Sequence, residues 1–104
     1  MLDFFKKLFS NNTEDLKAIV NDGAYLVDVR SKAEYESGHV KGSANIPLDQ
    51  IQQHIGKFKN KKNVVVFCRS GMRASQAKSI LQQNGISNVV NAGTWQKVNN
   101  LLKQ

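Results

Sequence analysis

An uninterrupted apolar run ends at the only cysteine of this 104-residue chain, and a helical pattern begins shortly after it. The run covers residues 64–67 (VVVF), and a valine-rich run of this kind is typical of a β-strand that is buried on both faces. From Met72 onward the apolar residues fall at positions 74, 77, 80 and 81, which is helical spacing. Cys68 is therefore predicted to occupy a strand-to-helix turn.

The turn after Cys68 combines features that favour a reactive thiol. The first N–H groups of a helix have no partner within the helix and attract anions. Arg69 and Arg73 add positive charge at the same place. A thiol in this position is expected to be partly ionised, and the thiolate is the nucleophilic form. A free cysteine is often only a small core residue, but packing does not explain two arginines at a helix start, so Cys68 is our candidate nucleophile.

Short strands and helices alternate along the rest of the chain. Further strands are predicted over residues 24–29, 44–46 and 89–90. Other helices are predicted to begin at Asn12 or Thr13, at a capping box on Ser31, at Pro47 (continuing to Phe58) and near Trp95. This alternation predicts an α/β fold with a small parallel sheet of four to five strands and helices on both faces. Ligands bind such sheets beyond the carboxyl ends of the strands, and Cys68 lies at that edge.

Length and composition indicate one ordered domain, residues 11–104, preceded by an apolar, amphipathic extension, residues 1–10. Charged residues interrupt the extension, so it is a poor signal peptide, and we expect it to dock on the domain rather than touch a membrane or a partner. One cysteine cannot form an internal disulfide, and no metal-ligand spacing is present, so no metal or other cofactor is expected. A free thiol fits a reducing compartment, which favours the cytoplasm.

The formal net charge of +7 includes a cluster of lysines at positions 57, 59, 61 and 62. Such a balance can steer small anions toward the protein. Only Phe58 supplies an aromatic ring within the cluster, so a nucleic-acid platform is weakly supported and none is expected. We interpret the cluster as a solvated loop between a helix and a strand.

Four motifs together resemble those of the single-domain rhodaneses. They are residues 28–30 (DVR), 34–35 (EY), 38–47 (GHVKGSANIP) and 68–73 (CRSGMR), and the resemblance runs from about residue 16 to about residue 95. It implies a rhodanese-like fold and an enzyme of the thiosulfate sulfurtransferase type, which moves sulfane sulfur through a persulfide on Cys68. It also implies that the donor and the persulfide are bound by Arg69, Ser70, Gly71, Met72 and Arg73. Among these, Arg69 would bind an anionic donor and Arg73 would brace the loop.

Four residues separate Cys68 from Arg73, whereas the related cell-cycle phosphatases and some arsenate reductases carry one more. The tighter loop suits a single sulfur atom, so phosphatase or arsenate reductase activity is a less favoured alternative. Attack of a thiolate on a sulfur–sulfur bond needs no general base. Without a second cysteine, an external acceptor must take the sulfur: cyanide in an assay, or a thiol or protein in the cell. A persulfide carrier that binds partners is the alternative from another class, and we expect a monomer or weak dimer.

Other polar residues near the site are interpreted as structural. In the family that the motifs resemble, Asp28 and Arg30 hold loops at the sheet edge through ion pairs. His39 follows a short helix, where a histidine can bond nearby carbonyls. The family usually has two glycines and aromatic residues after the last strand. This chain has Ala92-Gly93-Thr94-Trp95 instead, so the shape of one pocket wall is not predicted.

Overall fold

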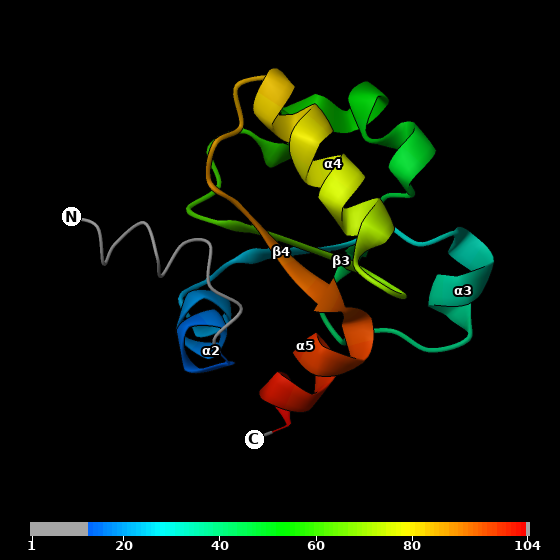
Figure 1. The fold of residues 1–104 in the computed structure, drawn as a ribbon, viewed down its shortest axis with the longest axis vertical. Coiled ribbons are helices and arrows are strands. Elements are labelled where there is room, and N and C mark those ends of the chain that lie inside the picture. Colours follow the sequence, from blue (N-terminus) through cyan, green and yellow to red (C-terminus); the bar gives the residue numbers. More distant parts are fainter. Residues whose placement is uncertain (1–12, 104) are drawn as a thin grey trace.

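The computed structural model describes residues 13–103, which form a four-stranded parallel sheet between two layers of helices (Figure 1). The strand order is β2-β1-β3-β4. In chain order the elements are α2 (Thr13–Asn21), β1 (Tyr25–Asp28), α3 (Lys32–Glu36), β2 (Ala44–Asn45), η1 (Leu48–Gln50), η2 (Gln52–Phe58), β3 (Val64–Cys68), α4 (Met72–Gln83), β4 (Val89–Thr94) and α5 (Trp95–Leu102). The α/β architecture with helices on both faces is confirmed. The predicted extension, residues 1–10, and Asn12 lie outside the described residues.

Strand β3 pairs with β1 on one side and β4 on the other, and all five of its residues are buried. Its side chains alternate between the two faces of the sheet. Val64, Val66 and Cys68 belong to the core cluster on one face, and Val65 and Phe67 belong to the cluster on the other. Because both faces are covered, the strand has no polar position, which explains the continuous apolar run in the sequence.

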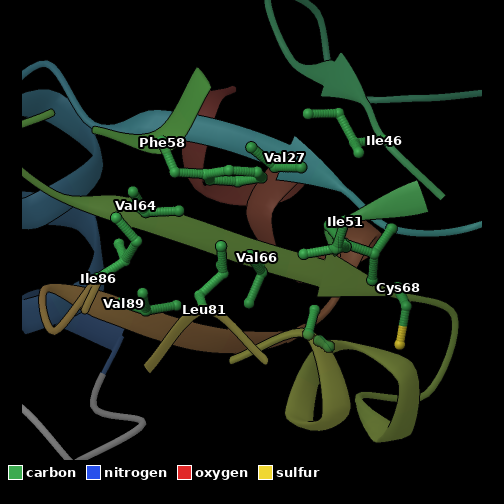
Figure 2. Packing of buried hydrophobic residues seen from close by; sticks show 13 residues of the cluster. Val27, Ile46, Ile51, Phe58, Val64, Val66, Cys68, Leu81, Ile86 and Val89 are labelled. Carbon is green, nitrogen blue, oxygen red and sulfur yellow. The ribbon is translucent and has the colours of Figure 1, made fainter. Parts of the chain in front are cut away.

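Helix α4 and the two 3₁₀ helices cover one face of the sheet, and α2 and α5 cover the other (Figure 1). On the α4 face, Ile51, Phe58 and Leu81 pack against the valines of β1 and β3 (Figure 2). On the opposite face, Leu16 of α2 and Val98 of α5 are buried against the sheet. In residues 13–103, no helix has both the length and the apolar character needed to cross a membrane.

The prediction of a single helix from Pro47 to Phe58 is wrong. The segment forms two short 3₁₀ helices, and His54 has non-helical angles (φ −117°, ψ 23°). Ile51 and Phe58 are both fully buried, and this packing directs the backbone of the segment. In a segment this short, tertiary packing outweighs the helical pattern of the sequence.

Helix α3 begins as predicted, whereas strand β4 differs from the prediction in length. The capping box of α3 is confirmed: Ser31 Oγ accepts from the Glu34 N–H, and a Glu34 carboxylate oxygen accepts from the Ser31 N–H. Strand β4 is longer than predicted because it continues to Thr94. An irregularity in the β3–β4 pairing lies between Val66 and Cys68, so that Cys68 is paired with Thr94. The end of β4 therefore lies beside the cysteine turn.

Candidate active site

The turn between β3 and α4 holds the Cys68 thiol beneath the backbone of Gly71. Cys68 is fully buried at the end of β3, and its side chain lies on the α4 side of the sheet (Figure 2). The Gly71 N–H donates to Cys68 Sγ at 2.9 Å. Gly71 has φ +98°, and a Cβ there would lie 3.3 Å from the Cα of Gly93. Glycine is therefore required for the geometry that directs this N–H at the sulfur.

The outer side of the same turn is open to solvent. Arg69 and Ser70 are exposed, and Met72 is 73% exposed. Arg69 has neither a hydrogen-bond nor an ion-pair partner within residues 13–103. The turn thus combines a buried sulfur with an unpaired cation and an apolar side chain on its rim.

Arg73 is joined to Glu34 of α3 by a two-pronged ion pair. Its Nη1 and Nη2 atoms lie 2.6 Å and 3.0 Å from the two carboxylate oxygens. This hydrogen bonding lowers the pKa of Glu34 to about 2 and raises the pKa of Arg73. The resemblance in the sequence implies that Arg73 braces the loop, and the structure adds Glu34 as its partner. An arginine in the first turn of a helix opposes the helix dipole, and that signal could have prompted a search for an acid.

Asn91 of β4 also contributes to the site, although no sequence motif indicates it. Its Nδ2 donates to the Gly71 carbonyl at 3.1 Å, and its Oδ1 accepts from the Gly93 N–H at 2.8 Å. These two bonds connect the cysteine turn to the end of β4. Asn91 therefore positions the residue whose N–H meets the sulfur.

The ion pair expected between Asp28 and Arg30 is confirmed and buried, with exposed side-chain fractions of 0% and 4%. Arg30 Nη2 also donates to the Gly38 carbonyl at 2.6 Å, and its guanidinium carbon lies 4.6 Å from the ring centroid of Trp95. The predicted structural role of His39 is supported by a 2.8 Å contact between its Nδ1 and the Tyr35 carbonyl.

A cavity of about 230 Å³ lies beside the cysteine turn. Its walls are formed by two arginines, an acid, an indole and two polar side chains: Arg30, Arg69, Glu34, Trp95, Ser37 and Gln96. The pocket wall that the sequence left open is thus supplied by Trp95. The Cys68 thiol is not part of this wall, since it is buried under the turn next to Arg69.

The fold and the site together define a class: a parallel α/β domain with a thiol at a strand-to-helix turn, one backbone N–H directed at the sulfur and two arginines in the turn. A family model confirms the class. The chain belongs to the family of the rhodanese-like domain, whose model matches residues 12–100.

Individual relatives support the same assignment. The thiosulfate sulfurtransferase PspE of Escherichia coli (strain K12) is 41% identical over 71 residues, which cover 66% of this chain and 68% of that protein. The uncharacterized protein YqhL of Bacillus subtilis (strain 168) is 37% identical over 68 residues, covering 65% of this chain but only 54% of that protein. A solved structure described as a rhodanese with anions from E. coli has a TM-score of 0.64 and 37% identity, covering 71% of this chain and 89% of its own. Because the relatives include sulfurtransferases, the family relationship supports sulfur transfer as the general class of chemistry.

Proposed function

We propose that this protein is a sulfurtransferase that moves sulfane sulfur from thiosulfate, or a related anionic donor, to a thiophilic acceptor through a persulfide on Cys68. The observation that carries the proposal is the 2.9 Å bond from the Gly71 N–H to Cys68 Sγ. It gives the buried sulfur a fixed N–H donor, which would stabilise the negative charge of the persulfide. The name of the E. coli relative, a thiosulfate sulfurtransferase, supports the same donor.

The reaction consists of two half-reactions. In the first, the Cys68 thiolate attacks the sulfane sulfur of thiosulfate. A new sulfur–sulfur bond forms, the sulfur–sulfur bond of thiosulfate breaks, and sulfite leaves with its electron pair. In the second, cyanide attacks the outer sulfur of the persulfide and forms the carbon–sulfur bond of thiocyanate. The electron pair of the broken sulfur–sulfur bond returns to Cys68 as the thiolate, so ping-pong kinetics are expected.

The turn supplies the remaining groups that this chemistry needs. Arg69 is the unpaired cation next to the nucleophile and would attract the anionic donor. Ser70 is an exposed residue of the same turn, and we propose that its hydroxyl hydrogen-bonds the outer sulfur of the persulfide. In the cell we propose a thiol or a protein as acceptor, and the cytoplasm as a compartment that keeps the single cysteine reduced.

The test is the formation of thiocyanate from thiosulfate and cyanide. The wild-type protein should be active and the Cys68→Ser variant inactive. After incubation with thiosulfate alone, the intact mass of the wild type should increase by one sulfur atom, and a thiol reductant should remove it. A Cys68→Ser variant as active as the wild type would refute the proposal, and efficient hydrolysis of an aryl phosphate would favour a phosphatase instead.

A persulfide carrier is a second candidate, favoured by the exposed Met72 at the rim of the turn. An apolar side chain beside a buried nucleophile suits contact with a protein surface. In that case sulfur transfer to a persulfide-accepting protein would be faster than transfer to cyanide. Met72→Ser would then slow only the protein-dependent reaction.

A further inference from the structure

Arg30 is buried in a way that leaves one edge of its guanidinium group unused. Its Nε donates to both carboxylate oxygens of Asp28 at 3.0 Å and 2.9 Å. Its Nη2 donates to Asp28 at 2.8 Å and to the Gly38 carbonyl at 2.6 Å. The two N–H groups of Nη1 have no partner among the residues that the structure describes.

Arg30 lines the cavity beside the cysteine turn. Within residues 13–103, every buried side-chain nitrogen or oxygen atom has a hydrogen-bond partner. Nη1 of Arg30 has none, so this atom is not fully buried and remains available to a ligand. Arg69 lines the same cavity and follows Cys68 directly in the chain.

We propose that Arg30 is a specificity-determining residue, and that its Nη1 binds the oxyanion end of the sulfur donor together with Arg69. This inference rests on the proposed sulfur-transfer function, because it assigns the site for the sulfonate oxygens of thiosulfate. A donor bound there lies beside the turn that contains Cys68. The structural role of Arg30 in its pair with Asp28 is retained, and the anion contact is added to it.

The two arginines make different contributions to the site. The charge of Arg30 is balanced by Asp28, and that of Glu34 in the cavity wall is balanced by Arg73. Arg69 has no acidic partner in the described part of the chain and therefore supplies the net positive charge. Arg30 supplies the N–H donors of Nη1 in fixed directions, because its guanidinium group is planar and its other N–H groups are held by Asp28 and the Gly38 carbonyl.

The guanidinium group of Arg30 is also held in place before any sulfur donor binds. Asp28 and the Gly38 carbonyl fix its edges, and Trp95 lies against its face with 4.6 Å between the guanidinium carbon and the ring centroid. A Cβ at Gly38 would lie 3.3 Å from the Trp95 ring, so this glycine permits the close stack. A donor group that is already oriented loses little side-chain entropy on binding.

The stack provides a direct measurement, because Trp95 is the only tryptophan of the chain. In the Cys68→Ser protein, which cannot react, thiosulfate is titrated while Trp95 fluorescence is recorded. We expect a saturable change with thiosulfate and with sulfate, and none with neutral dimethyl sulfone. Arg30→Lys, made in the same background, keeps the charge beside Asp28 but removes the Nη1 donors. It should weaken thiosulfate binding about tenfold, the loss expected for a hydrogen bond to a charged group.

Two further measurements separate a binding role from a purely structural one. Lys59→Gln removes an exposed lysine from outside the cavity and should change the affinity less than about twofold, as expected for a screened surface charge. If Arg30→Lys does not fold, the arginine Nε–H signals of the folded Cys68→Ser protein are followed by NMR. With thiosulfate, the Arg30 and Arg69 signals should shift along one binding curve. An unchanged affinity in folded Arg30→Lys, or an unmoved Arg30 signal while Arg69 responds, overturns the proposal.

The binding measurements do not depend on turnover. If thiosulfate binding requires Arg30 but the wild-type protein forms no thiocyanate, the anion site is supported and the proposed reaction is refuted. If the protein forms thiocyanate and Arg30→Lys leaves the KM for thiosulfate unchanged, the proposed reaction is supported and the anion site at Arg30 is refuted.

Discussion

Replacing Glu34 by glutamine should destabilise the protein at neutral pH and have progressively less effect as the pH falls. Glutamine is isosteric and can still complete the capping box of α3, where Ser31 is the N-cap. The substitution therefore removes mainly the charge that faces Arg73 across distances of 2.6 Å and 3.0 Å. Its effect measures the ionic link between α3 and the cysteine turn.

The magnitude follows from the pKa of Glu34, which hydrogen bonding by Arg73 lowers from 4.5 to about 2. A shift of this size corresponds to about 3 kcal/mol at most. The side chains of Glu34 and Arg73 are 30% and 35% exposed, and solvent screening reduces the contribution to about 1 kcal/mol. The carboxyl group has a lower pKa in the folded state, so its stabilisation is complete above about pH 5 and is lost as the pH falls toward 2.

Urea unfolding of the wild type and the variant at pH 7 and pH 3 tests this prediction. The difference in unfolding free energy should be about 1 kcal/mol at pH 7 and clearly smaller at pH 3. Glu36→Gln is the matched control: Glu36 lies on the same helix but is 65% exposed, and its contact with Lys32 is 4.0 Å long. It should cost only a few tenths of a kcal/mol, about the value of an exposed i,i+4 pair. An equal loss for both variants, or a Glu34→Gln loss that does not depend on pH, would refute the reasoning.

Three further substitutions test the packing and the turn, and urea unfolding measures each. Gly71→Ala should cost about 2 kcal/mol of stability and abolish sulfur transfer, because φ is +98° and the added Cβ would lie 3.3 Å from a backbone atom. Gly85→Ala is the control: its φ is +85° but its Cβ would meet no atom within 4 Å, so it should cost about 1 kcal/mol and keep activity. Asn91→Ala should cost about 2 kcal/mol through two lost hydrogen bonds and slow persulfide formation; an unchanged rate would exclude a positioning role. Leu81→Ala should cost about 3 kcal/mol and Leu102→Ala, at 40% exposure, much less, so equal losses would contradict the core assignment.

The sequence predicted those parts of the fold in which local pattern and tertiary packing agree. The apolar run that ends at Cys68 was correctly assigned to a buried strand, and the capping box on Ser31 to a helix start. The segment after Pro47 was assigned the wrong helix type because Ile51 and Phe58 reach the core along a path set by their neighbours. Strand β4 extends past Val90 because it pairs with β3, and pairing partners are not visible in one local window.

In the candidate site, too, the residues next to Cys68 in the sequence could be predicted, and the distant ones could not. Residues contiguous with Cys68 were found because their order in the chain places them on one turn. Glu34 is separated from Arg73 by 39 positions and Asn91 from Gly71 by 20, so neither contact has a local pattern. What brings them together is the strand order, in which β1 and β4 flank β3.

The direction of the Cys68 side chain depends on the parity of its position in β3. Cys68 shares the α4 face with Val64 and Val66, while Val65 and Phe67 face α2 and α5. Because successive side chains of a strand point to opposite faces, a shift of β3 by one residue would turn the thiol away from the first turn of α4. Such a shift would also place four valine and phenylalanine side chains against the wrong helices, and the buried core on both faces opposes it. The same valines that form the centre of the sheet therefore fix the side on which the sulfur meets its N–H donor.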